Sequence, residues 1–542
     1  NADQPYIWKM CGMLILLAAI GLTCSLTAQY FSAKAAVGFG TALRNDLFRH
    51  INSLSYREID TIGTSTLITR MTSDINQVQS GVNLVLRLFL RSPFIVFGAM
   101  IMAFQVNVRA VLIFVVAIPL LSIVVFGILL ISMPLYKKVQ KQLDRVLLTT
   151  RENLLGARVV RAFNRQQDEM KKFDEENSLL VNSQVFVGKI SALMNPVTYV
   201  IVNGATIILI WTGAWQVEGG IITQGAVVAL VNYMSQILVE LVKLANLIIT
   251  ISKSLACANR ISAVFEETSS IEDKADAAVL AANAGDAQEQ PAKVEFASMD
   301  FAYAGSSENA LSQISFRAMR GQTIGIIGGT GSGKSTLVNL IPRFYDATGG
   351  RVLVDGVNVK DMPLQALREK IGIVPQKAVL FKGTLRDNIR WGKPDATDEE
   401  IYHALEIAQA RDFVDSKDEG LDLMIQQGGK NLSGGQKQRL TIARALVRNP
   451  EILVLDDSAS ALDFATDAAL RKAIRENTKD MTVFLVSQRA TTIKNADQIL
   501  VLDDGNLVGR GTHKELLDTC EVYREICFSQ LSEKEVREHA EA

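Results

Sequence analysis

Long apolar runs occupy the first half of the sequence, and short β-branched runs separated by helical patterns occupy the second half. Each long run is sufficient for a membrane-spanning helix, because a bilayer core requires roughly 20 apolar residues per helix. A succession of such runs is not typical of the buried helices of a soluble protein. The pattern therefore predicts a helical transmembrane domain over residues 1–265, with five spans at about 7–30, 82–106, 109–135, 190–215 and 221–252.

The connections between these spans alternate in length and charge. Eleven basic residues occur from Lys137 to Lys189 in the connection after the third span, and the long connection after the first span is also basic. The other two connections are short and hold at most one arginine. The positive-inside rule therefore places both long connections, and everything after the last span, in the cytoplasm, and the start of the chain outside.

The predicted position of the N-terminus outside the membrane is unexpected, because residues 7–30 do not form a signal peptide. They lack the basic residues that begin a signal peptide and the small-residue cleavage site that ends it. We expect a further transmembrane helix ahead of residue 1. Such a helix would raise the number of spans to six and return the start of the chain to the cytoplasm.

The second half has the composition of a soluble protein. Residues 266–293 are acidic and alanine-rich without a sustained apolar face, which is typical of a linker, and residues 532–542 form a charged tail. Between them, over 294–531, strands such as TIGIIG, EILVLDD and MTVFLVS alternate with helical patterns. This alternation predicts an α/β domain with a largely parallel sheet.

A glycine-rich loop follows the strand TIGIIG and precedes a helical stretch, which is the context of a phosphate-binding P-loop. Its glycines allow backbone N–H groups to close around phosphates at a helix N-terminus. In this pattern Lys334 would contact the β- and γ-phosphates, and the Ser335 hydroxyl would bind Mg²⁺. The predicted loop consists of Gly328, Gly329, Thr330, Gly331, Ser332, Gly333, Lys334, Ser335 and Thr336.

Two further motifs extend this nucleotide site. An apolar strand ends at Asp456, whose carboxylate could hold the Mg²⁺ shell. A second anion-binding helix N-terminus is formed by Ser433, Gly434, Gly435 and Gln436. Because one phosphate cradle already exists, two such domains arranged head to tail could enclose nucleotide between the P-loop of one and the SGGQ segment of the other.

With these motifs the chain resembles, over essentially its whole length, exporter-type half-transporters of the ATP-binding cassette (ABC) family. LSGGQ at 432–436 matches the family signature. The resemblance implies that Tyr303 stacks on adenine and that Gln376 links Mg²⁺ to the contact with the membrane domain. It also implies that Asp463, in the segment beginning at Ser460, touches a partner subunit. The family's six-helix core supports the expected first helix.

The membrane half carries the resemblance as well. Residues 56–75 and 152–173 resemble the two intracellular loops of exporters. Their tips, near Tyr56–Gly63 and Phe163–Gln167, are expected to form short coupling helices that press on the nucleotide-binding domains.

Three positions depart from the family pattern. The residue after the Walker B aspartate is Asp457 instead of the glutamate that polarises water, and Gln488 replaces a histidine. Gln427 replaces a glutamate that usually precedes the signature. An aspartate carboxylate falls about 1.5 Å short of a glutamate carboxylate, and a misplacement of about 1 Å can cost roughly 10²-fold in rate. A glutamine can hydrogen-bond a phosphate but cannot carry charge or shuttle a proton.

Both sites of a homodimer would be impaired by these departures, so we expect a heterodimer. Its partner would be a second ABC half-transporter with the glutamate and histidine intact and an altered signature. A slow homodimer is the alternative. Hydrolysis would then occur mainly at the site that the partner completes.

The composition excludes several classes of function. Lys and Arg total 56 against 57 Asp and Glu, so no bulk basicity indicates nucleic acid, and five scattered cysteines suit neither a disulfide framework nor a zinc site. We expect a multi-pass protein of the cytoplasmic membrane, in contact with membrane lipid, that uses ATP to export small hydrophobic or amphipathic compounds by alternating access. The alternatives are a peptide or lipid exporter, and an ATP-binding sensor or gated channel.

One ionisable pair in the last span stays ambiguous in the sequence. Glu240 is followed three residues later by Lys243. An acid within a membrane segment is a functional candidate, but the pair could equally be a solvated contact on a helix that continues into the cytoplasm.

Overall fold

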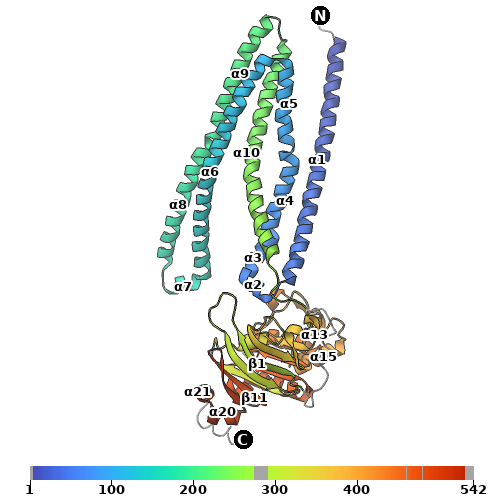
Figure 1. The fold of residues 1–542 in the computed structure, drawn as a ribbon, viewed down its shortest axis with the longest axis vertical. Coiled ribbons are helices and arrows are strands. Elements are labelled where there is room, and N and C mark those ends of the chain that lie inside the picture. The colour runs from blue at the N-terminus through green and yellow to red at the C-terminus, as the bar shows by residue number, and fades with distance from the viewer. Residues whose placement is uncertain (1–3, 274–290, 459–460, 479, 531–542) are drawn as a thin grey trace. The chain divides into compact units, whose positions relative to one another are not determined.

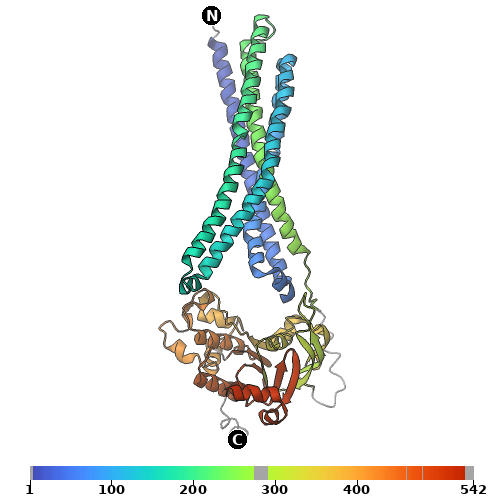
Figure 2. The ribbon, with the colours of Figure 1, turned by 90° about the vertical axis from the view of Figure 1, so that its left-hand side faces the viewer.

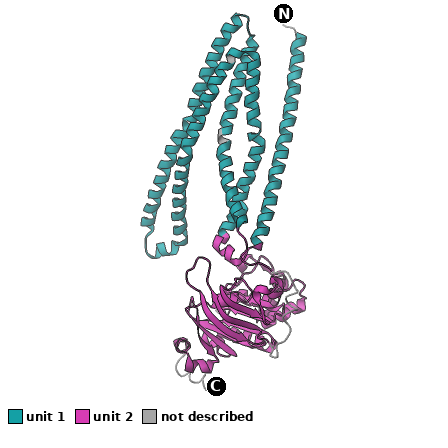
Figure 3. Cartoon of the chain, viewed as in Figure 1, with its two compact units in different colours: residues 1–52, 65–266 teal, residues 53–64, 267–542 magenta. Residues whose placement is uncertain are grey.

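The computed structural model describes residues 4–273, 291–458, 461–478 and 480–530. The chain divides into two compact units (Figure 3). We call them the helical unit, residues 1–52 and 65–266, and the sheet unit, residues 53–64 and 267–542. The short segment 53–64, which lies in the first predicted cytoplasmic connection, therefore belongs to the sheet unit. The predicted tail 532–542 and most of the predicted linker lie outside the described residues.

The helical unit confirms the predicted transmembrane fold. Among the described residues, five helical stretches are long and apolar enough to cross a membrane, and each predicted apolar run falls on one of them. The helices are α1 (Gln4–Ser53), α3 (Thr64–Thr69), α4 (Ile75–Leu84), α5 (Arg91–Val106), α6 (Val108–Leu155), α7 (Ala157–Ala162), α8 (Gln166–Ala192), α9 (Met194–Glu218) and α10 (Gln224–Glu266), with π-helical turns at Arg70–Asp74 and Val85–Phe89.

The helices of this unit pack in two groups. α6 lies along α8 and α9, and α10 lies along α4 and α5 (Figures 1 and 2). Phe114 and Leu121 on α6, Leu209 on α9 and Met234 on α10 are fully or almost fully buried in their shared core. Most large side chains of α1 are exposed and apolar, which suits a helix whose surroundings are lipid.

Close approach joins α4 to α10, and an ion pair joins the π-helical turn before α4 to α10. The Ser254 hydroxyl donates to the Gln77 carbonyl oxygen at 2.8 Å, and a Cβ on Gly81 would come within 2.3 Å of the Ser254 oxygen. One turn away, the buried Asp74 carboxylate accepts from Arg260 Nη2 at 2.6 Å. A small residue lets the backbones meet, and the arginine compensates the buried charge.

The ambiguous acid in the last span is buried and paired. Glu240 accepts a hydrogen bond from the Ser92 hydroxyl at 2.8 Å and one from Lys243 Nζ at 2.9 Å. Ser92 is on α5, so this acid joins two spanning helices. The contact favours the structural interpretation of this carboxylate.

The sheet unit confirms the predicted α/β domain and adds an antiparallel part. Among the described residues, ten strands form one sheet in the order β5-β4-β1-β2-β12-β11-β3-β10-β9-β6. Strands β11, β3, β10, β9 and β6 pair in parallel, whereas β1 pairs antiparallel with β2 and β4. The strands are β1 (Val294–Phe301), β2 (Leu311–Ala318), β3 (Thr323–Gly328), β4 (Gly349–Val354), β5 (Val357–Asn358), β6 (Ile371–Val374), β9 (Ile452–Asp456), β10 (Thr482–Val486), β11 (Gln498–Asp503) and β12 (Asn506–Gly511), with a separate pair of β7 (Gly383–Thr384) and β8 (Met424–Ile425).

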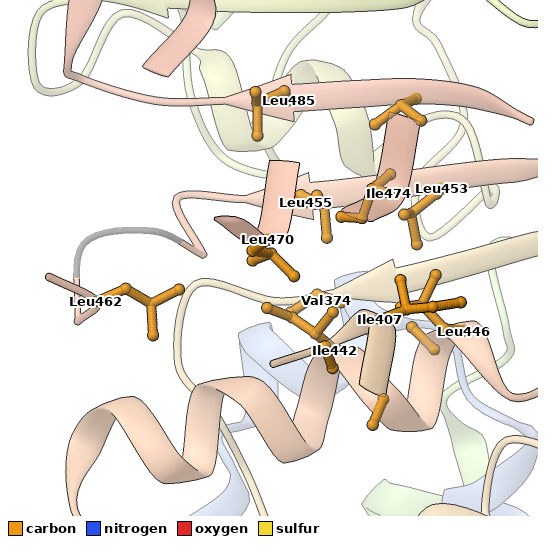
Figure 4. Packing of buried hydrophobic residues seen from close by; sticks show 14 of the residues in the cluster. Val374, Ile407, Ile442, Leu446, Leu453, Leu455, Leu462, Leu470, Ile474 and Leu485 are labelled. Carbon is orange, nitrogen blue, oxygen red and sulfur yellow. The ribbon is translucent and has the colours of Figure 1, made fainter. Parts of the chain in front are cut away.

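Helices cover the parallel part of the sheet. Leu455 and Leu485 on the central strands pack against Leu470 of α18 and Ile442 of α17 (Figure 4). These strands are buried along their whole length, which explains their continuous runs of Val, Ile and Leu. The α-helices of the sheet unit, among the described residues, are α2 (Tyr56–Ile62), α12 (Lys334–Asn339), α13 (Leu364–Glu369), α14 (Leu385–Arg390), α15 (Asp398–Ile407), α16 (Arg411–Asp415), α17 (Gly434–Leu446), α18 (Phe464–Asn477), α19 (Ala490–Ile493), α20 (His513–Thr519) and α21 (Glu521–Gln530).

Candidate nucleotide-binding site

A cavity of about 310 Å³ lies at the carboxyl ends of β3, β9 and β10. This edge of a parallel sheet is where α/β proteins bind their ligands. Residues predicted from the sequence supply most of its wall, namely Tyr303, Thr330, Gly331, Gly333, Lys334, Ser335, Thr336, Gln376, Asp456, Asp457 and Gln488. The fold therefore brings together side chains that are up to 185 positions apart, from Tyr303 to Gln488.

Two glycines of the loop are required by its geometry. Gly333 has φ +93°, and a Cβ there would approach the Ala310 carbonyl oxygen to 2.9 Å. At Gly328 a Cβ would come within 2.1 Å of the Leu502 carbonyl oxygen. Gly333 thus needs glycine for both its positive φ and its close neighbours, whereas Gly328 needs it because a Cβ would collide with the backbone.

Lys334 is buried beneath the loop that it completes. Its ammonium donates to the carbonyl oxygens of Gly328 at 3.0 Å and Gly329 at 2.5 Å, and to the Ser332 hydroxyl at 3.3 Å. Burial lowers the pKa of Lys334, and the nearby Asp457 and Asp456 carboxylates oppose that shift. A buried ammonium at a helix N-terminus is well placed to bind an anion.

Ser335 and Asp456 form a pair of oxygen donors. The Ser335 hydroxyl donates to Asp456 Oδ1 at 3.0 Å, across the junction between α12 and β9. Burial and the neighbouring Asp457 charge raise the pKa of Asp456 above its usual value. A buried carboxylate and a hydroxyl, with the Gln376 amide oxygen on the same cavity wall, suit a hard divalent cation.

Asp457 follows β9 in a left-handed backbone conformation, with φ 44°. Its N–H donates to the Val486 carbonyl oxygen at 3.1 Å, and its Oδ2 accepts from Gln376 Nε2 at 3.4 Å. Burial raises the pKa of this carboxyl, although Gln376, Lys334 and Arg489 counteract the rise. Aspartate is among the few residue types that tolerate this region of backbone space.

Gln488 lines the cavity with an exposed side chain, and its backbone is fixed from two sides. The preceding Ser487 N–H donates to the Ile326 carbonyl oxygen of β3 at 3.0 Å. On the far side, the Gln530 side chain of α21 donates to the Gln488 carbonyl oxygen at 2.7 Å. The turn is therefore held by the sheet and by the last described helix.

Tyr303 stands at the rim of the cavity with 41% of its surface exposed. Its hydroxyl lies 2.9 Å from the Thr336 hydroxyl, and its ring meets that of Phe301 edge to face. This ring is thus fixed in orientation and still accessible, as stacking on a base requires.

The signature residues do not line the cavity of their own chain. Ser433 caps α17 by accepting from the Gln436 N–H at 3.3 Å, and both Ser433 and Gly434 are exposed. Asp463 caps α18, accepting from the Thr466 N–H at 2.8 Å. Ser460, at the start of the predicted partner-contacting segment, lies outside the described residues.

Five cavity residues were not predicted as site residues, and one of them is Val486 at the end of β10. Asp504 and Gly505 form the tight turn between β11 and β12, and Asn309 and Ala310 precede β2. The Asp-Gly pair is a turn signal that the sequence displays. Its position at the cavity follows from the Ser312 N–H, which donates to the Gly505 carbonyl oxygen at 2.9 Å.

The helix α2 packs on the sheet unit beside this site. The Tyr56 ring lies 4.6 Å from that of Phe344, and Tyr345 donates to Asp60 at 2.6 Å. Ser55 caps the helix through its contacts with Glu58. Although burial opposes it, hydrogen bonds from Ser55 and Ser270 hold the pKa of Glu58 below its usual value.

The second predicted tip differs in detail from the structure. The short helix α7 covers Ala157–Ala162, and the predicted tip Phe163–Gln167 comprises a turn over 163–165 and the first two residues of α8. Asn164 makes this turn with φ 54°. Asparagine tolerates that conformation better than most residues, so the short helix lies before the predicted residues and not over them.

Comparisons with known proteins agree with this architecture. Residues 1–241 match the family of the ABC transporter transmembrane region, and residues 311–460 match the ABC transporter family. The chain is 36% identical to an uncharacterised ABC transporter ATP-binding protein of Mycobacterium tuberculosis, over 98% of this chain and 90% of that protein. It therefore belongs to the ABC transporter family, as an exporter-type half-transporter with its transmembrane and nucleotide-binding domains in one chain.

Other relatives carry more specific names. The putative multidrug export ATP-binding/permease protein YgaD of Bacillus subtilis is 34% identical over 92% of this chain and 85% of its own length. The ATP-dependent lipid A-core flippase of Desulfotalea psychrophila is 34% identical over 88% of this chain and 81% of its own. The solved structure of a bacterial Atm1-family ABC exporter with ATP bound is similar with a TM-score of 0.79 and 26% identity, covering 98% of this chain and 92% of that one.

Membership of this family establishes the broad activity. The protein is a multi-pass membrane transporter whose cassette binds ATP and drives export. As a half-transporter it requires a second half to form a complete translocation unit.

Proposed function

We propose that this chain exports small hydrophobic or amphipathic compounds across the cytoplasmic membrane as one subunit of an unequal pair. The site built on its own P-loop would bind ATP with Mg²⁺ and hydrolyse it slowly. The site that uses its LSGGQ segment would carry most of the turnover. The observation behind this proposal is the presence of Asp457 and Gln488 together on the cavity wall.

Asp457 is poorly suited to activate water. Its side chain is one methylene shorter than glutamate, and it contacts Gln376 at 3.4 Å. A general base must come within hydrogen-bond reach of the water that it activates. Gln488 can donate an amide hydrogen to a γ-phosphate but cannot become charged at any physiological pH.

Other features of the cavity favour binding. Lys334 lies beneath the loop, the rim aromatic is fixed, and Ser335, Gln376 and Asp456 are expected to hold Mg²⁺. Bound Mg²⁺ would neutralise phosphate charge. A site that binds ATP well and turns over slowly would remain ATP-loaded for much of the cycle and bias the paired cassettes toward the closed state.

The intact signature assigns this chain a role in the other site. Ser433 and Gly434 are exposed at the start of α17, where a partner's nucleotide could reach them. The partner is expected to supply the glutamate and histidine, together with an altered signature.

The test compares this chain alone with the pair that it forms with a co-expressed second ABC half-transporter that carries the glutamate and the histidine. The expected result is little ATPase from the chain alone and full ATPase from the pair. Changing the partner's catalytic glutamate to glutamine should abolish turnover, whereas Asp457→Asn should change it only modestly. Loss of transport in Asp457→Asn, or equal ATPase from the chain alone, would overturn the unequal-pair proposal.

Substrate class is the second part of the proposal. The similarity to YgaD, named for multidrug export, supports small amphipathic compounds. The similarity to a lipid A-core flippase supports a lipid as the second candidate. ATP-dependent accumulation of a cationic dye in inside-out vesicles tests the first, and movement of a fluorescent lipid between leaflets tests the second. ATP binding without either movement would indicate a sensor or gated channel instead.

A further inference from the structure

The last described helix holds the turn that carries Gln488. α21 ends at Gln530, whose side chain makes two hydrogen bonds to the backbone of this turn. Its Nε2 donates to the Gln488 carbonyl oxygen at 2.7 Å, and its Oε1 accepts from the Ala490 N–H at 2.9 Å. The Gln530 amide thus bonds to the backbone of both neighbours of Arg489, as donor to one and as acceptor from the other.

The position of Gln530 is itself well determined. Tyr523 and Cys527, on the preceding turns of α21, are completely buried in the hydrophobic core of the sheet unit. The Tyr523 hydroxyl lies 2.7 Å from Nδ1 of His513 on α20. Because two core residues fix the helix, its final residue is presented to the turn with little freedom.

The turn over residues 488–490 lies between Gln530 and the part of the cavity that the P-loop lines. Gln488 lines the cavity near Lys334 and Asp457. The adjacent Arg489 guanidinium lies over the Phe464 ring, 5.1 Å from its centroid. Phe464 follows Asp463, so the turn also touches the segment that is expected to face a partner subunit.

We propose that Gln530 is a positioning residue: it fixes the turn over residues 488–490 so that the Gln488 amide faces the γ-phosphate of ATP, and it thereby sets the preference of this cavity for ATP over ADP. The base and the α- and β-phosphates are expected to contact Tyr303 and the P-loop, whereas the Gln530 side chain bonds to Gln488 and Ala490 among the described residues. Loss of the clamp should therefore weaken ATP binding selectively. This proposal requires only that ATP binds here, so it stands or falls separately from the unequal pairing.

The experiment measures ATP and ADP affinity of the full-length chain in lipid nanodiscs, with Mg²⁺ present. Gln530→Ala should weaken ATP binding by on the order of tenfold, as expected from the loss of two hydrogen bonds, and change ADP binding less than about twofold. Gln530→Glu keeps the acceptor for Ala490 but loses the donor to Gln488, so it should weaken ATP binding as well. Thermal unfolding with ADP bound checks that each variant is folded.

Two further variants test whether Gln530 acts by positioning Gln488 or by stabilising the fold in general. Ser529→Ala changes the neighbouring exposed residue, whose hydroxyl donates to the Ile526 carbonyl oxygen in its own helix, so the variant should bind both nucleotides normally. In a Gln488→Ala background, Gln530→Ala should cause little additional loss, because the clamp acts through Gln488. Equal weakening of ATP and ADP, no change in either, or full additivity with Gln488→Ala would each overturn the proposal.

Discussion

The Tyr345 hydroxyl donates a 2.6 Å hydrogen bond to the Asp60 carboxylate, which joins the loop after the P-loop helix to the short helix α2. Burial and the hydrogen bond to Asp60 both raise the pKa of Tyr345, so its hydroxyl stays protonated and remains a donor. The Tyr345 ring also meets the ring of Tyr303 edge to face, with centroids 5.6 Å apart. A continuous set of contacts therefore runs from the rim of the nucleotide cavity to α2.

The first prediction concerns this hydrogen bond. Tyr345→Phe preserves the ring contact with Tyr303 and removes the hydroxyl, leaving Asp60 without that donor. If α2 couples the cassette to transport, transport per ATP hydrolysed should fall about threefold or more, because a hydrogen bond to a charged group contributes roughly 1.5–3 kcal/mol. Transport and ATPase are measured on the same vesicles.

Asp60→Asn provides the matched comparison from the other side of the bond. A double-mutant cycle should give a coupling energy of at least about 0.5 kcal/mol, because the two residues are in direct contact. Fully additive effects, or a parallel fall in ATPase and transport, would assign the bond a purely local role.

The second prediction concerns the P-loop lysine. Lys334→Ala removes the buried ammonium that contacts Gly328 and Gly329. Loss of a charge-assisted contact of roughly 1.5–3 kcal/mol should weaken ATP binding by on the order of 10- to 100-fold. Titration calorimetry of the full chain measures the change, and the exposed Lys382→Ala serves as the control. ATP affinity within about twofold of the wild type would contradict this role of Lys334.

The third prediction is a gain of activity. Asp457→Glu combined with Gln488→His should raise hydrolysis at this chain's site at least about tenfold, because a base and a proton carrier each contribute on the order of 10²-fold or more. Turnover is measured with the partner's catalytic glutamate changed to glutamine, so that it reports this site alone.

Neither single substitution should suffice in that experiment. Glutamate is less favoured than aspartate at φ 44°, so Asp457→Glu alone should give only part of the gain. If the double variant is no faster than the wild type, these two positions do not limit hydrolysis.

The fourth prediction links pH to stability. Lys293, almost fully buried, forms an ion pair with Asp355 at 2.6 Å. Although burial opposes it, Lys293 and Lys370 hold the pKa of Asp355 below its usual value. The stabilisation is therefore present above the unfolded-state pKa of about 4 and is lost as pH falls through the lower folded-state value.

Asp355→Asn should accordingly lower stability by about 1–3 kcal/mol at pH 7, and the difference should shrink at progressively lower pH below about 4. Thermal unfolding of wild type and variant across this range measures it. Asp480→Asn is the control, since its side chain is 89% exposed and its ion pair with Arg320 should contribute little. If the stability difference between wild type and Asp355→Asn instead grows as the pH falls, the assigned direction of the Asp355 pKa shift is wrong.

The membrane and cassette halves and most of the nucleotide site were predictable from local sequence. A spanning helix needs only a long apolar run, and a P-loop needs glycines between a strand and a helix, so both patterns are complete within one short segment. The antiparallel strands β1 and β4 were harder to anticipate, because strand direction depends on pairing partners and not on composition.

What the sequence determined by itself is the set of chemical groups: the P-loop ending in Lys334, the Asp456 carboxylate, the exposed signature serine, and the substitutions at Asp457 and Gln488. Only the tertiary structure decided which distant groups meet. Gln376 reaches Asp457, Gln530 holds the Gln488 turn, and Tyr345 bonds to Asp60. Those contacts depend on how sheet edges and helix ends converge in space, and no local periodicity or motif encodes that convergence.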